Sequence, residues 1–323
     1  MWKVILFLFL ILIGSIEVGR TIGIRNYILG NATGEVMCYF TLKGKYEKEK
    51  LIQVLDSYEI FNYRLFGTRL VKMGIGMKSY DLGGSSRATL LSIRIDQARD
   101  DYTLNITFHH GVFDMQYIME ILDAYLRNDS SPKPLQISKS VYLSDVEPSI
   151  LKPWNYLRSV VIKREKIVVT NEDINGFRAS TGLSSLDIVF AILGRKYLMD
   201  AGKTSCILSI IRSTRTQPND KFRIGNMVTF HNVKISGRDT VTDIADRIRK
   251  SYSKGTTFSA ADVVITSWVP HKGFSHLYPA IKSNGRLYTS FRPRLYHKLH
   301  HQQISVSKRD DNYLCDIHRS SYV

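Results

Sequence analysis

One stretch, residues 102–127, constrains the fold of this 323-residue chain more than any other. Within it, residues 102–108 alternate apolar and polar side chains, which is the period of a half-buried strand. Apolar residues then recur at helical spacing over residues 118–125. Two adjacent histidines, His109 and His110, lie between these patterns. The sequence therefore predicts a histidine pair where a strand ends and a helix begins, a position that can face a cleft.

The residues around the histidine pair favour general-base chemistry. A neutral imidazole is suited to taking a proton near pH 7 once its tautomer and orientation are fixed. Asp114 can fix both, directly or by anchoring an arginine, and Gly111 would let the backbone turn sharply. Two surface histidines with satisfied hydrogen bonds remain an alternative. A metal site is not predicted, because adjacent histidines point different ways and no cysteine or further histidine lies at ligand spacing.

The segment His109-His110-Gly111-Val112-Phe113-Asp114 resembles the HHxxxD signature of the chloramphenicol-acetyltransferase-like superfamily. This superfamily includes the BAHD acyltransferases, the condensation domains of peptide synthetases and the wax-ester synthase/diacylglycerol acyltransferase group. The resemblance implies that His110 is the general base and that Asp114 is mainly structural. The families usually place glycine after the aspartate, whereas this chain has Met115.

A second block resembles a BAHD segment that reads R-x-R, then proline, then Gly-Asn. Here it is Arg212-Ser213-Thr214-Arg215, followed by Pro218 and by Ile224-Gly225-Asn226. In those enzymes an arginine of this block pairs with the aspartate of the histidine motif, which a guanidinium can hold with two hydrogen bonds. Arg212 aligns best with this role and Arg215 second. An arginine facing water is the alternative.

Another strand is expected at residues 263–265, and it leads into Thr266 and Ser267. In the superfamily the equivalent strand delivers polar groups near the substrate channel, so the resemblance makes these hydroxyls candidate oxyanion donors. The BAHD signature DFGWG is absent. Strands near residues 304–307 and 313–317 look closer to the wax-ester-synthase and condensation arrangement.

The resemblance implies an α/β fold, namely a two-domain chloramphenicol-acetyltransferase-like sandwich in which mixed sheets flanked by helices enclose an inter-domain channel. The first half is expected at residues 20–128 and the second at 159–323. Residues 129–158 are rich in serine and proline and are predicted to be the crossover linker. Further elements follow from periodicity. They are strands at 36–40, 90–95, 159–169 and 205–211, and helices at 51–58, 170–177, 184–197 and 240–252.

The chain is strongly basic, with a net charge of +16. This charge suits an anionic membrane surface or an acidic ligand such as coenzyme A, and a solvated basic surface is an equal alternative. No nucleic-acid-binding signature occurs, so we expect no nucleic-acid partner. The three cysteines, which are Cys38, Cys206 and Cys315, are widely spaced and predict neither a disulfide framework nor a zinc site.

Residues 1–19 predict a targeting segment. Lys3 precedes an unbroken apolar run at 4–13, which is short for a bilayer span and typical of a signal-peptide core. An uncleaved anchor and a buried first strand are alternatives. Sequons at Asn31 and Asn128 are candidate glycosylation sites. We therefore expect the secretory pathway (lumenal, membrane-anchored or secreted) and otherwise the cytoplasm.

The expected function is acyl transfer from a thioester, with acyl-coenzyme A as co-substrate, to a hydroxyl or amine of a small molecule. His110 would be the base, and no permanently bound cofactor or metal is expected. The protein is expected to be a monomer that associates with membranes through residues 1–19. The alternative is a non-catalytic lumenal or secreted protein that binds a hydrophobic ligand in the inter-domain tunnel.

Overall fold

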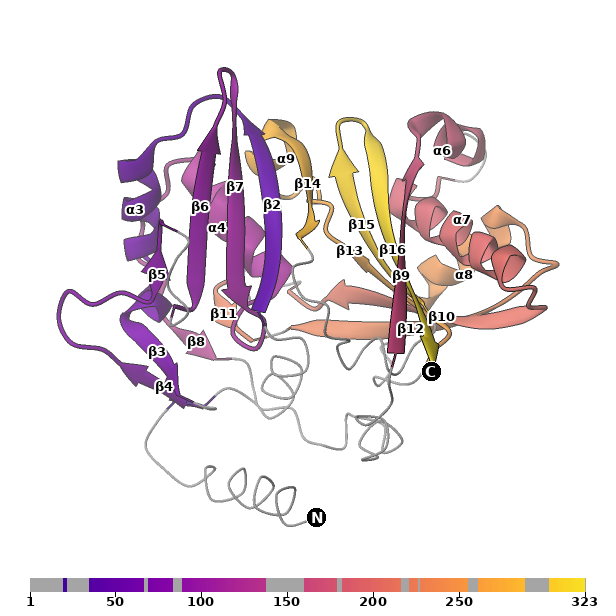
Figure 1. The fold of residues 1–323 in the computed structure, drawn as a ribbon, viewed down its shortest axis with the longest axis horizontal. Coiled ribbons are helices and arrows are strands. Elements are labelled where there is room, and N and C mark those ends of the chain that lie inside the picture. The colour runs from indigo at the N-terminus through magenta and orange to yellow at the C-terminus, as the bar shows by residue number, and fades with distance from the viewer. Residues whose placement is uncertain are drawn as a thin grey trace, which may run out of the picture.

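A single mixed sheet runs through both halves of the molecule (Figure 1). The computed structural model describes residues 20–21, 35–66, 69–83, 89–137, 160–178, 182–215, 221–225, 227–254, 261–287 and 302–322. Among them, eleven strands form this sheet. Nine of them lie in the order β12-β10-β13-β15-β14-β2-β7-β6-β5, and the other two are β16, which pairs with β15, and β9, which pairs with β16. The α/β class is thus confirmed, whereas the separate sheet expected in each half is one continuous sheet.

The first half has the strand–helix alternation that the sequence predicted. Its strands are β2 (Glu35–Lys43), β5 (Tyr80–Asp81), β6 (Leu91–Gln97) and β7 (Asp101–His109). Its helices are α3 (Lys48–Asp56) and α4 (Met115–Leu126), with the 3-10 turn η1 at Glu59–Asn62. In β7, apolar side chains are buried at every second position, as the alternation predicted.

The second half contains most of the remaining elements. Its strands are β9 (Val160–Val169), β10 (Ser205–Ser213), β12 (Val228–Ser236), β13 (Val263–Ser267), β15 (Gln302–Arg309) and β16 (Asn312–Tyr322). Its helices are α6 (Asn171–Arg178), α7 (Ser185–Asp200) and α8 (Val241–Ser251). Side-chain caps begin the last two helices at Ser184 and Thr240, as their sequence patterns predicted.

Smaller sheets flank the large one. β1 (Arg20–Thr21), β4 (Arg69–Lys72) and β3 (Tyr63–Phe66) form a three-stranded sheet in that order. β8 (Gln136–Ile137) pairs in parallel with β11 (Arg223–Ile224). β8 lies inside the segment expected to be the linker, and residues 138–158 of that segment lie outside the described residues, as does the segment 1–19.

Strand β14 (Ile281–Leu287) connects the two halves, because it pairs with β2 on one side and β15 on the other. Asn284 is fully buried in it, donates to the carbonyl of Trp268 and accepts from the amide of Lys308 at 2.8 Å. The next residue is Gly285, where a Cβ would lie 2.8 Å from the ring of Tyr39. A polar residue and a glycine are therefore required here, although neither is typical of a strand.

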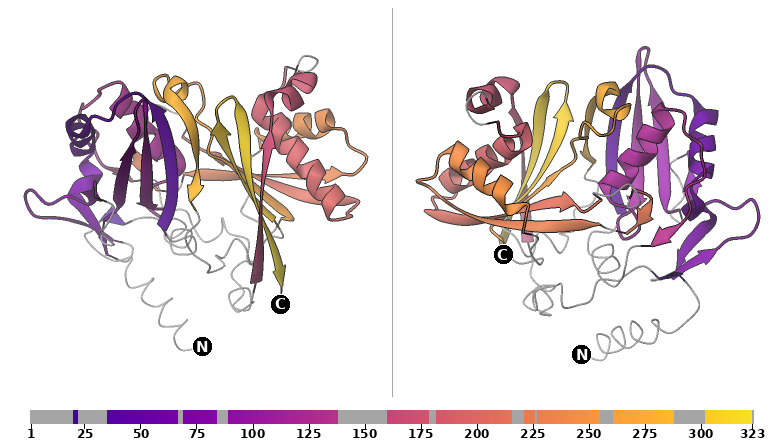
Figure 2. Two further views of the ribbon diagram at one scale, coloured as in Figure 1. Left: turned by 45° about the horizontal axis from the view of Figure 1, so that its top comes forward. Right: turned by 180° about the vertical axis from the view of Figure 1, so that it is seen from behind.

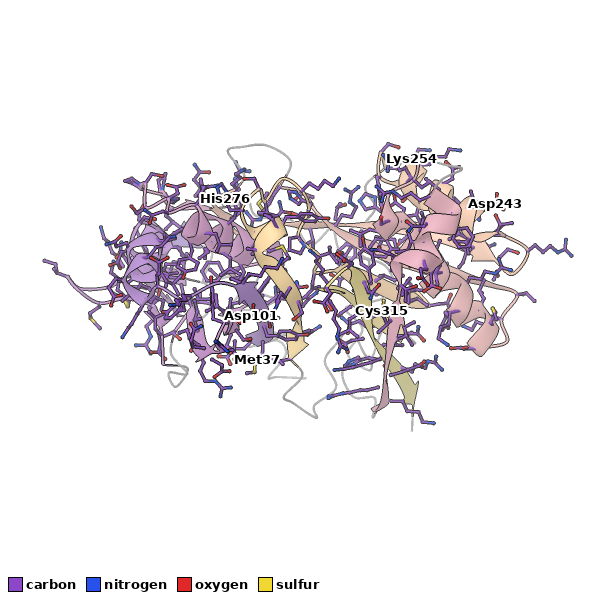
Figure 3. All side chains as sticks on the ribbon, turned by 90° about the horizontal axis from the view of Figure 1, so that it is seen from above. Met37, Asp101, Asp243, Lys254, His276 and Cys315 are labelled. Atoms are coloured by element: carbon purple, nitrogen blue, oxygen red, sulfur yellow. The ribbon has the colours of Figure 1, made fainter. Side chains whose placement is uncertain are left out.

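Side chains gather in two cores that the sheet joins. Seen from above, Asp101 and His276 lie with one group and Cys315 and Asp243 with the other (Figure 3). The first core also contains residues from late in the chain, including Trp268, Phe274 and Leu277 of α9 (Leu277–Ala280). The two cores thus do not follow the sequence division at residues 129–158.

Helix α9 is tied to α4 by one buried carboxylate. Asp123 accepts from the amides of His276 and Leu277 at 2.9 and 2.8 Å, and it is also paired with Arg127 at 3.1 Å. The view from behind shows α4 and α3 covering one face of the first-half strands (Figure 2, right). Within the described residues, no helix is long and apolar enough to cross a membrane.

Candidate active site

A cavity of about 730 Å³ lies where the two halves meet. Its wall contains His110 and Asp114 from the first half and strand ends and helix ends from the second. The other lining residues that matter here are Met115, Met119, Asp187, Arg212, Arg215, Arg249, Tyr252, Thr266, Ser267, Trp268, Arg286 and Gln303. A volume of this size suits a small molecule rather than a macromolecule.

His110 follows the last residue of β7 and faces this cavity, half-buried. Its Nδ1 lies 3.1 Å from the carbonyl oxygen of Phe113. Because a carbonyl oxygen only accepts hydrogen bonds, Nδ1 carries the proton, and in the neutral ring Nε2 is the basic nitrogen. The ring also lies edge-on to Phe108, with centroids 6.0 Å apart. The loop thus fixes both the tautomer and the orientation of the imidazole.

His109 has a different environment. It is the last residue of β7, and its Nδ1 accepts from the amide of Gly111 at 3.2 Å. Burial lowers the pKa of His109 below its ordinary value, so the ring is neutral near pH 7. Gly111 is buried and has a negative φ, so the turn does not use the left-handed conformation that glycine allows. His109, unlike His110, does not line the cavity, and its hydrogen bond to Gly111 supports the loop.

Asp114 connects the loop to three other segments. It is the N-cap of α4 and accepts from the amide of Tyr117 at 2.9 Å. Its carboxylate also accepts from Nε of Arg215 at 3.1 and 3.0 Å and from the amide of Met227 at 3.1 Å. With 3% of its surface exposed, Asp114 is a buried acceptor whose two oxygens are both hydrogen-bonded. Its hydrogen bonds therefore connect the histidine loop to α4, to Arg215 and to Met227.

Arg215, and not Arg212, is the arginine that pairs with Asp114. Its guanidinium is fully buried, and it also donates to the carbonyls of Arg223 and Gly225. Gly225, at a φ of 115°, donates its amide to the carbonyl of Val112 at 2.7 Å. Arg215 and Gly225, both from the second half, therefore bind the histidine loop through Asp114 and Val112. Pro218 and Asn226 of the same block lie outside the described residues.

Our preference for Arg212 as the partner of Asp114 is wrong. Arg212 is exposed, and its guanidinium lies 3.9 Å from the centroid of the Tyr252 ring. The hydroxyl of Tyr252 donates to Asp187 at 2.6 Å, and Arg249 approaches the same carboxylate at 3.4 Å. Arg212 and Arg249 thus lie on the second-half wall of the cavity near the buried carboxylate of Asp187. Besides Tyr252 and Arg249, the hydroxyl of Ser184 also donates to this carboxylate.

The candidate oxyanion donors also lie on the cavity wall. Thr266 and Ser267 are half-buried at the end of β13. The Ser267 hydroxyl accepts from the amide of Val269 at 3.2 Å, which leaves its own proton to be donated elsewhere. Met115, the first residue of α4, also lines the cavity.

Three lining residues had no signal in the sequence. Arg286 of β14 lies over the ring of Trp268, with the guanidinium 5.8 Å from the centroid. Gln303 of β15 also faces the cavity. Trp268 lies just after β13 and lines the cavity as well. All three reach the cavity because β13, β14 and β15 pair across long sequence distances, which no local pattern reports.

Neither metal ligands nor glycans change this description. Within the described residues, no group of three histidine, cysteine or acidic side chains is arranged to hold a metal. Asn128 is exposed after the end of α4. Asn105 lies in β7 and donates to Asp96 at 2.6 Å. Asn31 lies outside the described residues.

Comparison with known proteins shows the fold. No protein-family model matches the chain, and no curated protein matches it significantly. Among solved structures it is similar to polyketide synthase associated protein 5 from Mycobacterium tuberculosis, with 14% identity, a TM-score of 0.64 and coverage of 94% of this chain and 93% of that one. It is also similar to the first condensation domain of the CDA synthetase, with 12% identity, a TM-score of 0.62 and coverage of 94% and 91%.

A third similar structure is F. graminearum TRI101 complexed with coenzyme A and deoxynivalenol, with 9% identity, a TM-score of 0.59 and coverage of 95% of both chains. These proteins have the chloramphenicol-acetyltransferase-like fold, and so does this chain. The fold inferred from the histidine motif is therefore confirmed.

Proposed function

We propose that this protein is an acyltransferase in which His110 is the general base. The observation that carries the proposal is the hydrogen bond from Nδ1 of His110 to the Phe113 carbonyl, inside a cavity between the halves. It assigns the proton to Nδ1 and the basicity to Nε2. The buried Asp114–Arg215 pair supports the proposal, because it fixes the loop that carries the ring.

The proposed reaction needs no covalent enzyme intermediate. Nε2 of His110 takes the proton from an acceptor hydroxyl or amine while the acceptor atom attacks the thioester carbonyl. The tetrahedral oxyanion accepts a hydrogen bond from the hydroxyl of Thr266 or Ser267. Collapse breaks the carbon–sulfur bond, and the thiolate takes the proton back from the imidazolium. The products are an ester or amide and a free thiol.

The proposed donor is acyl-coenzyme A. Two arginines on the second-half wall, Arg212 and Arg249, suit the phosphates of such a donor, and Arg212 has no carboxylate partner among the described residues. The overall charge of +16 favours anionic ligands as well. The similar structure of TRI101 holds coenzyme A, which supports the same donor class here.

The test is thiol release from acyl-coenzyme A by the purified protein with a panel of small hydroxyl and amine acceptors. His110→Ala should lower the rate about 10²–10⁴-fold, as expected for loss of a general base. His276→Ala is the matched control, because His276 is exposed and does not line the cavity. Equal activity in His110→Ala and the wild type would refute the proposal that His110 is the general base of an acyltransferase. A protein that binds apolar ligands in the cavity without any turnover would instead be the non-catalytic binder.

We further propose that residues 1–19 direct the chain into the secretory pathway, either as a cleaved signal or as a retained anchor. The apolar run at 4–13 supports this proposal. Amino-terminal sequencing of the protein from a secreting host distinguishes the two, because a retained anchor leaves Met1 or the residue after it at the terminus.

A further inference from the structure

The end of β4 and the loop that leads to β5 expose apolar side chains at one end of the molecule. Val71, Ile75 and Met77 are 48%, 107% and 57% exposed. They are three of the six exposed large hydrophobic residues found among the described residues, and they lie within seven consecutive positions. The loop projects at the left of Figure 1, at the opposite end from α7 and α8. Such a local concentration marks a surface that contacts something other than water.

The loop has a defined conformation. The amide of Met77 donates to the carbonyl of Gly74 at 3.2 Å, which closes a four-residue turn. Gly76, with a φ of 79°, occupies the third position, where type II turns require glycine. Ile75 is therefore at the second position, at the tip of the turn. Leu70, in β4, points the other way and is buried in the first core.

One exposed basic residue, Lys72, flanks the apolar side chains. From residue 60 to residue 79 the sequence contains four basic residues and no acidic residue. Lys72 is exposed next to Val71, and Lys78 is paired with Asp56 at 3.0 Å. An apolar tip with a basic flank suits the surface of an anionic bilayer, where the apolar side chains enter and the lysine meets the head groups.

The chain connects this loop to the apolar run at the amino terminus. β1 pairs with β4 through Arg20 opposite Leu70 and Thr21 opposite Arg69. Six residues separate Ile13, the end of the apolar run, from Arg20, so at most about 25 Å of chain joins them. A leader retained in a bilayer would thus hold this three-stranded sheet close to the membrane.

We propose that the segment 71–77, which we name the apolar loop, inserts Ile75 and Met77 into the surface of an anionic lipid bilayer. A second copy of the chain is disfavoured as the occupant, because two basic loops would repel each other. The proposal is independent of acyl transfer, and it adds a second membrane contact to the one expected from residues 1–19.

The experiment places an environment-sensitive fluorophore on the full chain at Ile75→Cys. The three native cysteines, at positions 38, 206 and 315, are buried, so the introduced thiol takes the label. The matched control is Met199→Cys, since Met199 is also exposed but lies on α7 at the far end. Each labelled protein is mixed with vesicles of equimolar phosphatidylcholine and phosphatidylserine, and then with vesicles of phosphatidylcholine alone.

With the anionic vesicles, we expect severalfold brighter, blue-shifted emission at position 75, quenching by spin-labelled lipids, and no change at position 199. Lys72→Glu should weaken the response, and phosphatidylcholine alone should give less of it. Binding is also measured by pelleting the vesicles. If the protein pellets with the vesicles but the emission at position 75 does not change, the proposal is overturned, because residues 1–19 or another face would then be the contact. Absence of pelleting would overturn it as well. A change at position 75 that grows with protein concentration without lipid would assign the apolar loop to self-association instead.

Discussion

Arg215 holds Asp114 across 101 positions of sequence, with Nε 3.1 and 3.0 Å from the two carboxylate oxygens. The pair links the two halves of the molecule directly behind the candidate base. Since Asp114 also caps α4, one carboxylate sets the start of that helix and the position of the histidine loop together. The position of the loop that carries His110 thus depends on contacts made by Asp114 and Arg215.

Breaking the Asp114–Arg215 pair should lower the free energy of unfolding much more than changing Arg212 does. Asp114→Ala leaves the buried guanidinium of Arg215 without its counter-charge, and we expect a loss of about 3–5 kcal/mol in the free energy of unfolding. Arg212→Gln, on an exposed arginine, should change that free energy by less than about 0.5 kcal/mol. Urea unfolding followed by circular dichroism measures both. Similar stabilities in the two variants would show that the ion pair does not hold the halves together.

The histidine loop was predictable because its information is local. Alternation in residues 102–108, the adjacent histidines and the helical spacing after Asp114 all lie within 26 residues, and the structure places each as expected. The caps at Ser184 and Thr240 were predictable for the same reason. Each depends on contacts between residues at most four positions apart.

Strand β14 and the arginine assignment were not predictable, because their contacts are distant. Asn284 and Gly285 disfavour a strand by composition, and only the partners in β2, at Trp268 and in β15 make them suitable. Arg212 lies near the end of β10 and Arg215 lies two residues beyond it. The choice between them depends on which side chain reaches the buried carboxylate, and spacing from the Gly-Asn pair does not determine it.

Stability should fall in acid partly because of His318. Burial, aided by Arg164 and Arg286, lowers the pKa of His318 to about 4, below its ordinary value of 6.5. The folded protein therefore keeps this ring neutral, whereas the unfolded chain takes up a proton below pH 6.5. The stabilisation is complete above pH 6.5 and is lost as the pH falls towards 4, by up to ~3 kcal/mol.

The measurement for His318 is urea unfolding at pH 7 and pH 5 in the wild type and in His318→Gln. The glutamine variant should lose less free energy of unfolding between these two pH values than the wild type does. Other titrating groups are common to both proteins, so the difference isolates the histidine. An identical loss in both would mean that His318 is equally easy to protonate in the folded and unfolded states.

Entry into the secretory pathway should be visible at Asn128. This sequon is exposed after the end of α4. The triplet that begins at Asn105 is also a sequon, but it lies in the middle of a paired strand. Expressed in a secreting eukaryotic host, the protein should lose mass on amidase treatment, and Asn128→Gln should reduce that loss. Asn105→Gln should leave it unchanged. A glycan on Asn105 would contradict the pairing of β7, and no glycan on Asn128 would remove the support for a lumenal location.

The second-half wall makes a prediction about the donor that is separate from the chemistry. If Arg212 contacts a phosphate, Arg212→Gln should raise KM for acyl-coenzyme A about 10- to 150-fold, because a charge-assisted hydrogen bond contributes about 1.5–3 kcal/mol. kcat should stay within a factor of two or so, since Arg212 does not hold the loop of His110. Acyl-pantetheine lacks the phosphates, so its KM should be the same for the variant and the wild type. An equal rise in KM for both donors would show that the substitution disturbs the cavity through Tyr252 and not through a lost phosphate contact. Because turnover of acyl-pantetheine is measured in the same assay, a wrong donor and an inactive enzyme give different results.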